Sequence, residues 1–243
     1  MPLHFVVDAA ADAHVGDRVV LTGAEAHHAA LVRRVRPGEQ ITLGDGRGTW
    51  LCAHCEDIAP KEVAVRVSAR DEVPAPSPRV VLVQALAKGD RDELAVQAAT
   101  ELGVDEIVPW QAARSVSRWD GPKQVKGRAR WQTIAREAAK QAHRAWIPEV
   151  AEVTTTRALI AAAAASRLVV LEPTGSERLV ALDLSDGRDI VLVVGPEGGI
   201  AADELAAFAD AGATIAALGD TVLRTSTAGP AALAVVSAHL GRW

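Results

Sequence analysis

Two glycine turns near the C-terminal end of the sequence each follow a strand-forming stretch, and both have the composition of a ligand-binding loop. The first turn, 195–199, reads Gly-Pro-Glu-Gly-Gly and follows the stretch 189–194. The second begins at Gly219, after the stretch 214–218, and leads into Val-Leu-Arg-Thr-Ser-Thr-Ala over 222–228. In open α/β sheets such turns gather at the carboxyl ends of the strands, where ligands bind. The sequence therefore predicts a small-molecule pocket.

The first turn does not match the common nucleotide-binding patterns. No GxxxxGK[ST] phosphate loop occurs in the sequence, and 195–199 lacks the GxGxxG spacing of dinucleotide-binding loops. A plain tight turn is the alternative interpretation, because glycine punctuates many loops.

A basic window lies in the middle of an acidic chain. The net charge over 243 residues is −5, but residues 111–144 contain nine basic and two acidic side chains, a local charge of +7. Such clustering indicates a nucleic-acid surface, because Lys and Arg neutralise phosphates. The alternative is a solvated helix face. The basic residues are Arg114, Arg118, Lys123, Lys126, Arg128, Arg130, Arg136, Lys140 and Arg144.

Composition is that of an ordinary globular protein, with 49% hydrophobic and 23% charged residues. The N-terminus lacks a basic leader and no apolar run approaches the length of a membrane span, which predicts a cytoplasmic protein without a membrane partner. Cys52 and Cys55 flank His54 in a strand-like segment, and no second Cys or His pair has zinc-site spacing. We therefore expect structural cysteines and no metal.

The first part of the chain is predicted to form a small β-barrel. Short strand patterns, separated by glycine and proline turns, cover 18–21, 40–43, 49–58 and 62–69. A helical pattern over 24–32 interrupts them and leads into Arg33, Arg34 and Arg36, three cations suited to gripping phosphate.

A proline-rich segment over 71–78 marks the predicted domain boundary, because its prolines can neither continue a helix nor pair within a sheet. Beyond it, strand and helix patterns alternate, which favours a largely parallel sheet covered by helices. Strands are expected at 80–85, 106–108, 167–171, 189–194 and 214–218, and helices at 90–102, 126–142 and 158–165. We place the domains at 1–72 and 79–243.

Motifs along almost the whole chain, in order, resemble those of the SPOUT methyltransferases and most closely the RsmE family. Besides the two glycine turns, the matching segments include His28 with 32–38 (Val-Arg-Arg-Val-Arg-Pro-Gly), 84–91 (Gln-Ala-Leu-Ala-Lys-Gly-Asp-Arg), 100–104 (Thr-Glu-Leu-Gly-Val) with Ile107 and Pro109, and 137–139 (Glu-Ala-Ala) with Gln141 and Arg144.

The resemblance implies an S-adenosylmethionine-dependent enzyme that methylates N3 of a uracil in 16S ribosomal RNA of the small ribosomal subunit, with the assembled subunit as the expected partner. It implies an N-terminal PUA-like β-barrel that binds RNA and a C-terminal SPOUT α/β domain with a deep trefoil knot. The knot follows only from the resemblance, because threaded chains are essentially absent from ordinary folds. A homodimer with each active site near the subunit interface is also implied.

The resemblance and the residue types together indicate which residues form the cofactor site. The three turns after Leu171, Val194 and Leu218 are expected to hold the cofactor, with Leu218, Val222 and Leu223 around the adenine; ordinary core packing is the alternative for those three. Cofactor-binding candidates are Leu171, Glu172, Pro173, Gly195, Pro196, Glu197, Gly198, Gly199, Leu218, Gly219, Val222, Leu223 and Arg224.

Arginine suits the support of negative charge that spreads onto the uracil oxygens during transfer. Arg224 and Arg144 are the catalytic candidates, with a phosphate contact or a surface ion pair as the alternative for either. No general base is assigned, since the turn that carries Glu197 is expected to face the cofactor. RNA-binding candidates are Arg33, Arg34, Arg36, Lys88, Arg114, Arg118, Lys123, Lys126 and Arg128.

Several positions depart from the family pattern, among them Gly229-Pro230, which directly follows the motif 222–228. Ser226 stands where a glutamate is usual before Thr-Ala, and Ala98 replaces a common lysine. Two other functions therefore stay open: a SPOUT enzyme that methylates a ribose 2'-hydroxyl or another base, and a non-catalytic RNA-binding ribosome-assembly factor.

Overall fold

The computed structural model describes residues 2–59 and 61–243 and divides the chain into two compact units. The first unit runs up to Ala75 and also includes 139–147, whereas the second comprises 76–138 and 148–243. The division between Ala75 and Pro76 falls inside the proline-rich segment. The return of 139–147 to the first unit differs from the predicted domain limits, which assigned that segment to 79–243.

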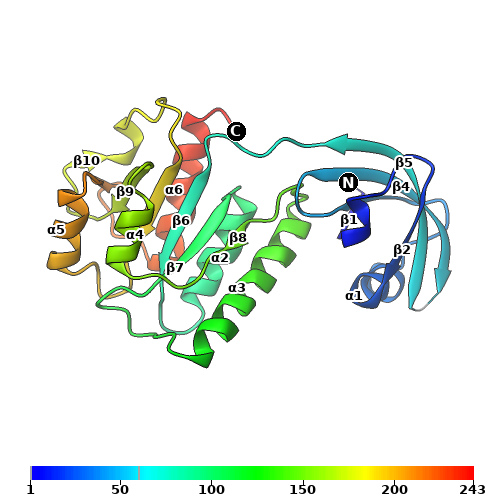
Figure 1. Ribbon diagram of the computed structural model, residues 1–243, viewed down its shortest axis with the longest axis horizontal. Helices are drawn as coiled ribbons and strands as arrows, with labels where there is room; N and C mark the ends of the chain where they lie inside the picture. The colour runs from blue at the N-terminus through cyan, green and yellow to red at the C-terminus, as the bar shows by residue number, and fades with distance from the viewer. Residues whose placement is uncertain (1, 60) are drawn as a thin grey trace. The chain divides into compact units, whose positions relative to one another are not determined.

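The first unit is built on a five-stranded sheet with the order β1-β3-β4-β5-β2 (Figure 1). The pairs β3–β4, β4–β5 and β5–β2 are antiparallel, and β1 joins β3 in parallel. Apolar side chains on alternate positions, such as Leu51, Ala53 and Cys55, bury one face of the sheet. The strands are β1 (Leu3–Val6), β2 (Arg18–Thr22), β3 (Gln40–Gly44), β4 (Thr49–Ala59) and β5 (Glu62–Glu72), and a 3-10 turn η1 spans Asp8–Ala10.

The predicted helix over 24–32 consists of two parts. An α-helix, α1 (Gly23–His27), continues into a π-helical turn, η2 (His28–Val32). Leu31 and Val32 are exposed at the end of η2, and the chain leaves it through Arg33 and Arg34, the latter with a φ of +54°. The π-helical turn thus presents apolar and cationic side chains next to one another on the surface.

The segment 139–147, here the return segment, is tied to the first unit by backbone and side-chain hydrogen bonds. The Gly48 N–H donates to the Ala145 carbonyl at 3.1 Å, and the Ile147 N–H donates to the Gly46 carbonyl at 3.0 Å. Lys140 Nζ lies 2.8 Å from Glu25 Oε1; the Lys140 side chain is buried, and that of Glu25 is 13% exposed. A buried ion pair of this kind holds its two elements together strongly, because separating it would leave an unpaired buried charge.

His4 lies buried next to the return segment. Its ring stacks on Trp50 with centroids 4.3 Å apart, and its Nδ1 is 3.0 Å from Thr42 Oγ1. Since the Thr42 hydroxyl donates its proton to the Leu3 carbonyl, His4 donates from Nδ1 and leaves the buried Nε2 without a partner among the described residues. Burial, together with His143 and Lys140 nearby, lowers the pKa of His4 to about 4.

The second unit is a seven-stranded parallel sheet with the order β10-β12-β9-β11-β6-β7-β8 (Figure 1). This confirms the predicted parallel sheet. The strands are β6 (Val80–Ala85), β7 (Glu106–Trp110), β8 (Glu149–Val150), β9 (Arg167–Leu171), β10 (Glu177–Arg178), β11 (Ile190–Val194) and β12 (Thr214–Ala217).

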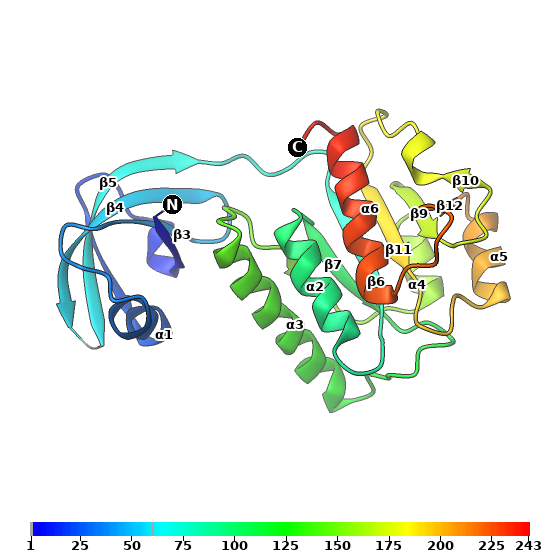
Figure 2. The same cartoon turned by 180° about the vertical axis from the view of Figure 1, so that it is seen from behind.

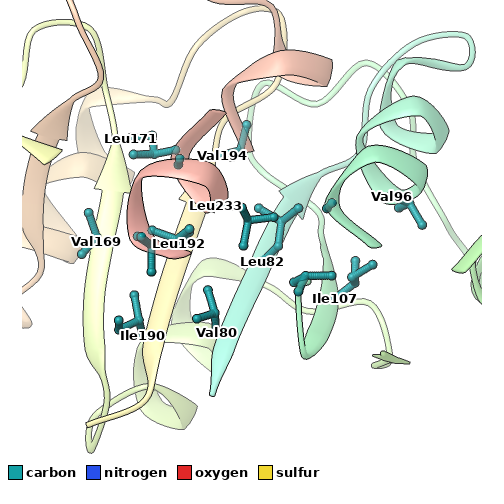
Figure 3. Packing of buried hydrophobic residues seen from close by; sticks show 14 of the residues in the cluster. Val80, Leu82, Val96, Ile107, Val169, Leu171, Ile190, Leu192, Val194 and Leu233 are labelled. Atoms are coloured by element: carbon teal, nitrogen blue, oxygen red, sulfur yellow. The ribbon is translucent and has the colours of Figure 1, made fainter. Parts of the chain in front are cut away.

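Helices cover both faces of this sheet, so its central strands read as continuous apolar runs. Figure 2 shows α2, α3 and α6 on one face, while α4 and α5 lie on the other. Leu82, Leu192 and Leu233 pack in the core beneath α6 (Figure 3), and Val83, Val193 and Phe208 pack in the core on the opposite face. The helices are α2 (Arg91–Glu101), α3 (Pro122–Gln141), α4 (Thr156–Ala162), α5 (Ala202–Asp210) and α6 (Thr225–His239), with a 3-10 turn η3 (Leu179–Ala181).

Helix α3 begins four residues before the predicted start at 126. Pro122 is its first residue, a position that proline favours because its fixed φ suits the first turn and its missing N–H has no intrahelical partner there. The two-residue strands β8 and β10 were not predicted, because segments this short carry no periodic pattern.

Candidate active site

A cavity of about 340 Å³ opens beyond the carboxyl ends of β9, β11 and β12, next to the first turn of α6. This is the edge of a parallel sheet where ligands bind. Both glycine turns line it, together with the residues after β9. Every predicted cofactor-binding residue except Gly198 lines the cavity: Leu171, Glu172, Pro173, Gly195, Pro196, Glu197, Gly199, Leu218, Gly219, Val222, Leu223 and Arg224.

The first glycine turn is held by its own backbone and by Arg114. The Gly199 N–H donates to the Pro196 carbonyl at 2.9 Å, and Gly199 has a φ of +71°, which favours glycine. Arg114 Nη1 donates to the carbonyls of Gly198 and Ile200 at 3.2 and 3.4 Å. A Cβ added to Gly198 would lie 3.4 Å from the Cβ of Arg114. A side chain at position 198 would therefore meet Arg114 first.

Glu197 joins this turn to the start of α2. Its Oε1 accepts hydrogen bonds from the Lys88 backbone N–H at 2.8 Å and from Arg91 Nη1 at 3.2 Å. The carboxylate is thus engaged by one backbone donor and one cation, which join the glycine turn to the loop before α2. Asp92 also holds the loop that contains Lys88, because its Oδ2 accepts a hydrogen bond from the Ala87 N–H at 3.1 Å. Burial raises the pKa of Asp92.

The second glycine turn leaves space and apolar surface open to a ligand. A Cβ added to Gly219 would have no heavy atom within 4 Å, and its φ lies outside the left-handed range. Val222 is 79% exposed at the rim, while Leu218 is partly buried against the core. Arg224 precedes α6 and is exposed, and its guanidinium has no hydrogen-bond or ion-pair partner among residues 2–59 and 61–243.

Six further residues line the cavity that the sequence analysis did not assign to the cofactor. Arg91 belongs to the motif 84–91, and Thr225 and Ala228 belong to the motif 222–228, so motif membership was a signal that these three residues lie near the site. Nothing in the residue types marks the others, because apolar and small residues are equally common in the core. The six are Arg91, Val194, Ile200, Thr221, Thr225 and Ala228.

The basic window divides into engaged and unengaged side chains. Arg128 Nε donates to the Val150 carbonyl at 2.7 Å, and Arg130 pairs with Glu93 at 2.9 Å. Among the residues that the structure describes, the side chains of Arg118, Lys123 and Lys126 have no partner, and all three are exposed. The predicted RNA-binding residues Arg33, Arg34, Arg36 and Lys88 are also exposed.

The two predicted catalytic arginines come from different units. Arg224 lines the cavity of the second unit, whereas Arg144 belongs to the return segment and is not among the residues that line the cavity. The structure therefore places Arg224 at the site and leaves the role of Arg144 as a prediction.

Among residues 2–59 and 61–243, no group of three or more His, Cys, Asp or Glu side chains is arranged to hold a metal ion. Cys52 and Cys55 are both free thiols, and burial raises the pKa of Cys55. In the described part of the chain, every helix is too short or too polar to cross a lipid bilayer.

Family models and curated relatives match nearly the whole chain. Residues 74–237 match the RNA methyltransferase domain family, and residues 21–68 match the RNA methyltransferase PUA domain family. The ribosomal RNA small subunit methyltransferase E of Mycobacterium bovis is 46% identical, with 98% of this chain and 92% of that protein covered. The protein of the same name from Bacillus subtilis is 31% identical, with 89% and 88% covered.

A solved structure shows the same fold. The ribosomal RNA small subunit methyltransferase E of Neisseria gonorrhoeae, bound to S-adenosyl methionine, superposes with a TM-score of 0.88 at 29% identity and covers 98% of both chains. These similarities confirm the predicted fold class, a PUA-like domain followed by a SPOUT α/β domain; the knot stays a prediction. The chain belongs to the RNA methyltransferase family that includes ribosomal RNA small subunit methyltransferase E.

Proposed function

We propose that this chain methylates N3 of a uracil in 16S ribosomal RNA and uses S-adenosylmethionine as the methyl donor. The observation that carries the proposal is the cavity at the two glycine turns, in a chain whose structural relative at a TM-score of 0.88 is bound to that cofactor. The residues for cofactor binding and the domain limits 1–72 and 79–243 are part of the proposal; the segment 139–147 belongs to the second domain in sequence and groups with the first compact unit in the structure.

The lining of the cavity fits this cofactor. An adenine ring needs apolar contacts on its faces and backbone N–H and C=O groups at its edge. Leu218, Val222 and Leu223 offer the apolar contacts, and Val222 is unusually exposed for a valine. Because no atom lies within 4 Å of a Cβ added to Gly219, a ligand can approach that backbone closely.

When bound, S-adenosylmethionine supplies an electrophilic methyl group on a sulfonium. Loss of the N3 proton from uracil spreads negative charge onto the two flanking carbonyl oxygens. Arg224 lines the cavity, and its guanidinium is unengaged among the residues that the structure describes. A donor of fixed charge placed at such oxygens stabilises the transition state. We assign this role to Arg224 and keep Arg144 as the second candidate.

No side chain in the cavity is assigned as general base. The carboxylates that line it are Glu172 and Glu197, within the part of the chain that the structure describes. Glu197 is held by Lys88 and Arg91, which favours a role in shaping the turn. Proton loss is therefore assigned to the medium, with the anion supported by arginine.

The exposed cations are proposed to bind the RNA backbone. Phosphate contacts position a nucleic acid, and unpaired Lys and Arg side chains on the surface supply them. Arg33, Arg34 and Arg36 would act from the PUA-like unit, and Lys88, Arg118, Lys123 and Lys126 from the methyltransferase unit. Arg114 and Arg128 are engaged with backbone carbonyls of their own unit, so we give them a weaker part in RNA binding.

We further propose a homodimer, a cytoplasmic location and the assembled small subunit as the substrate. Light scattering of the purified protein tests the dimer, and a monomer at micromolar concentration would contradict it. Methylation of assembled small subunits in preference to protein-free 16S RNA tests the substrate.

Two measurements test the function as a whole. Calorimetry with S-adenosylmethionine must show binding, and a protein that folds but binds no cofactor would favour a non-catalytic assembly factor. Mapping of modified nucleotides in ribosomal RNA, from cells with and without the gene, must show one N3-methylated uracil that depends on the gene. A gene-dependent ribose methyl group or a methyl group on another base would replace the proposed reaction.

A further inference from the structure

Gln84 is a polar residue inside an otherwise apolar strand. It is the fifth residue of β6, and all six residues of this strand are buried. Its exposed fraction is 0%. Burial of an amide is unfavourable unless hydrogen bonds replace those lost to water. A glutamine at this position is therefore expected to do more than fill space in the core.

The amide of Gln84 begins a short chain of hydrogen bonds. Gln84 Nε2 donates to Thr225 Oγ1 at 2.9 Å, and Thr225 Oγ1 donates to the Gly195 carbonyl at 2.8 Å. A threonine hydroxyl has a single proton, and here it is used on Gly195, so Thr225 must accept from Gln84. The direction of each bond in the chain is therefore fixed, and the position next to Thr225 requires a donor.

This chain ties three elements together at the cavity. Gln84 lies on β6, Thr225 is the first residue of α6, and Gly195 begins the turn after β11. Thr225 and Gly195 line the cavity, whereas Gln84 does not. Arg224, the proposed catalytic residue, directly precedes Thr225. A residue that fixes Thr225 thus fixes the backbone of Arg224 relative to the first glycine turn.

The unpaired oxygen of Gln84 supports a role in positioning. Gln84 Oε1 is buried and has no partner among the described residues, although Nε2 makes a further bond to the Ala85 carbonyl at 3.2 Å. A leucine would fill similar volume without leaving a buried acceptor unsatisfied. Packing alone would therefore favour an apolar residue over glutamine at this position. What glutamine adds is the Nε2 donor that reaches Thr225.

We propose that Gln84 is a positioning residue of the cofactor site. Its amide donates to Thr225 and so holds the first turn of α6, with Arg224, against the glycine turn at Gly195. Gln84 touches neither cofactor nor substrate. The inference rests on the proposed cofactor site and adds a residue, buried beneath it, that sets its geometry.

The Gln84→Leu and Gln84→Glu variants separate a donor from a space-filling role. Leucine keeps the volume and removes the donor at every pH. A glutamate keeps the shape but donates only when protonated, and burial raises the pKa of such a carboxyl toward neutrality. Cofactor affinity of Gln84→Glu should therefore improve as the pH is lowered, which a space-filling role does not predict.

The experiment is calorimetric titration of the full-length protein with S-adenosylmethionine at pH 8 and pH 6, with melting curves as a check of folding. Both variants should bind roughly ten-fold more weakly than wild type at pH 8, as expected for one lost buried hydrogen bond. Relative to wild type at the same pH, Gln84→Glu should recover at pH 6 and Gln84→Leu should not. Thr100→Val is the matched control, because it removes a buried hydroxyl bonded to the Val96 carbonyl of α2, and its affinity should equal that of wild type.

Thr225→Val gives a second test that does not depend on the folding of the Gln84 variants, because it removes the hydroxyl between Gln84 and Gly195 and should also weaken binding roughly ten-fold. Combination with Gln84→Leu should lower affinity no further than either change alone. Additive losses, or a Gln84→Glu variant whose affinity relative to wild type is the same at both pH values, would overturn the inference. A folded wild-type protein that binds no cofactor would overturn the proposed function itself.

Discussion

Gly219→Val tests the cavity at the point where the structure leaves most room. The added Cβ meets no heavy atom within 4 Å, and the backbone there is outside the left-handed range, so the folded protein can accept the side chain. We expect a change in the free energy of unfolding of about 0.5 kcal/mol or less, as for other unstrained surface positions. The three added carbons occupy space that the cofactor needs. Overpacking of a fitted site costs about 1–3 kcal/mol, so the dissociation constant should rise by roughly 5- to 150-fold.

Calorimetric titration with S-adenosylmethionine measures the affinity, and thermal melting measures the stability of the same sample. Ala206→Val is the matched control, because it adds carbons to an exposed position of α5 that does not line the cavity. Its affinity should equal that of wild type. A folded Gly219→Val protein with wild-type affinity would refute the assignment of this turn to the cofactor.

Three further predictions concern charge. Arg224→Gln should lower the rate of methyl transfer at saturating cofactor about 100-fold, as for loss of one oxyanion donor; an unchanged rate would remove Arg224 from catalysis. Joint replacement of the unpaired cations Arg118, Lys123 and Lys126 by glutamine should flatten the slope of log RNA affinity against log salt concentration by about 2, at roughly 0.7 per phosphate contact on single-stranded RNA; an identical slope would favour a solvated face. The pKa of His4 is about 4 in the folded state and near 6.5 in the unfolded chain, so below pH 6.5 the unfolded chain takes up a proton that the folded protein does not. The contribution of His4 to the free energy of unfolding is therefore complete above pH 6.5 and falls by about 3 kcal/mol as the pH drops from 6.5 to 4. Urea unfolding across this range should show that loss, and a His4→Phe variant with an equally steep dependence would contradict the assignment to His4.

Local sequence patterns predicted the parallel sheet and the residues of its glycine turns because both signals are local. Apolar runs such as 80–85 and 190–194 bury both faces of their strands, and the turns follow where the runs end. The pattern could not show that Gly198 faces Arg114 and not the cavity, because the sequence of a turn does not give the direction in which each of its residues faces.

Long-range contacts account for most of what the sequence did not reveal. No pattern in the residues 139–147 predicts that Ala145 and Ile147 form backbone hydrogen bonds with Gly48 and Gly46, about a hundred positions earlier in the chain. A count of charges across 111–144 gives the local charge but does not show which side chains have partners. The hydrogen bond from Arg128 to the Val150 carbonyl was therefore not predicted. Gln84 was quoted only as part of a motif, because its bond to Thr225 spans 141 positions.

The central claim is tested most directly by incubation of the purified protein with S-adenosylmethionine and small ribosomal subunits from cells that lack the gene. Mass spectrometry of the digested 16S RNA identifies the product nucleoside. The account predicts N3-methyluridine at one position, and none when Gly219→Val replaces the wild-type protein at cofactor concentrations below the raised dissociation constant. A 2'-O-methylated nucleoside, a methyl group on another base or unmodified RNA would contradict it.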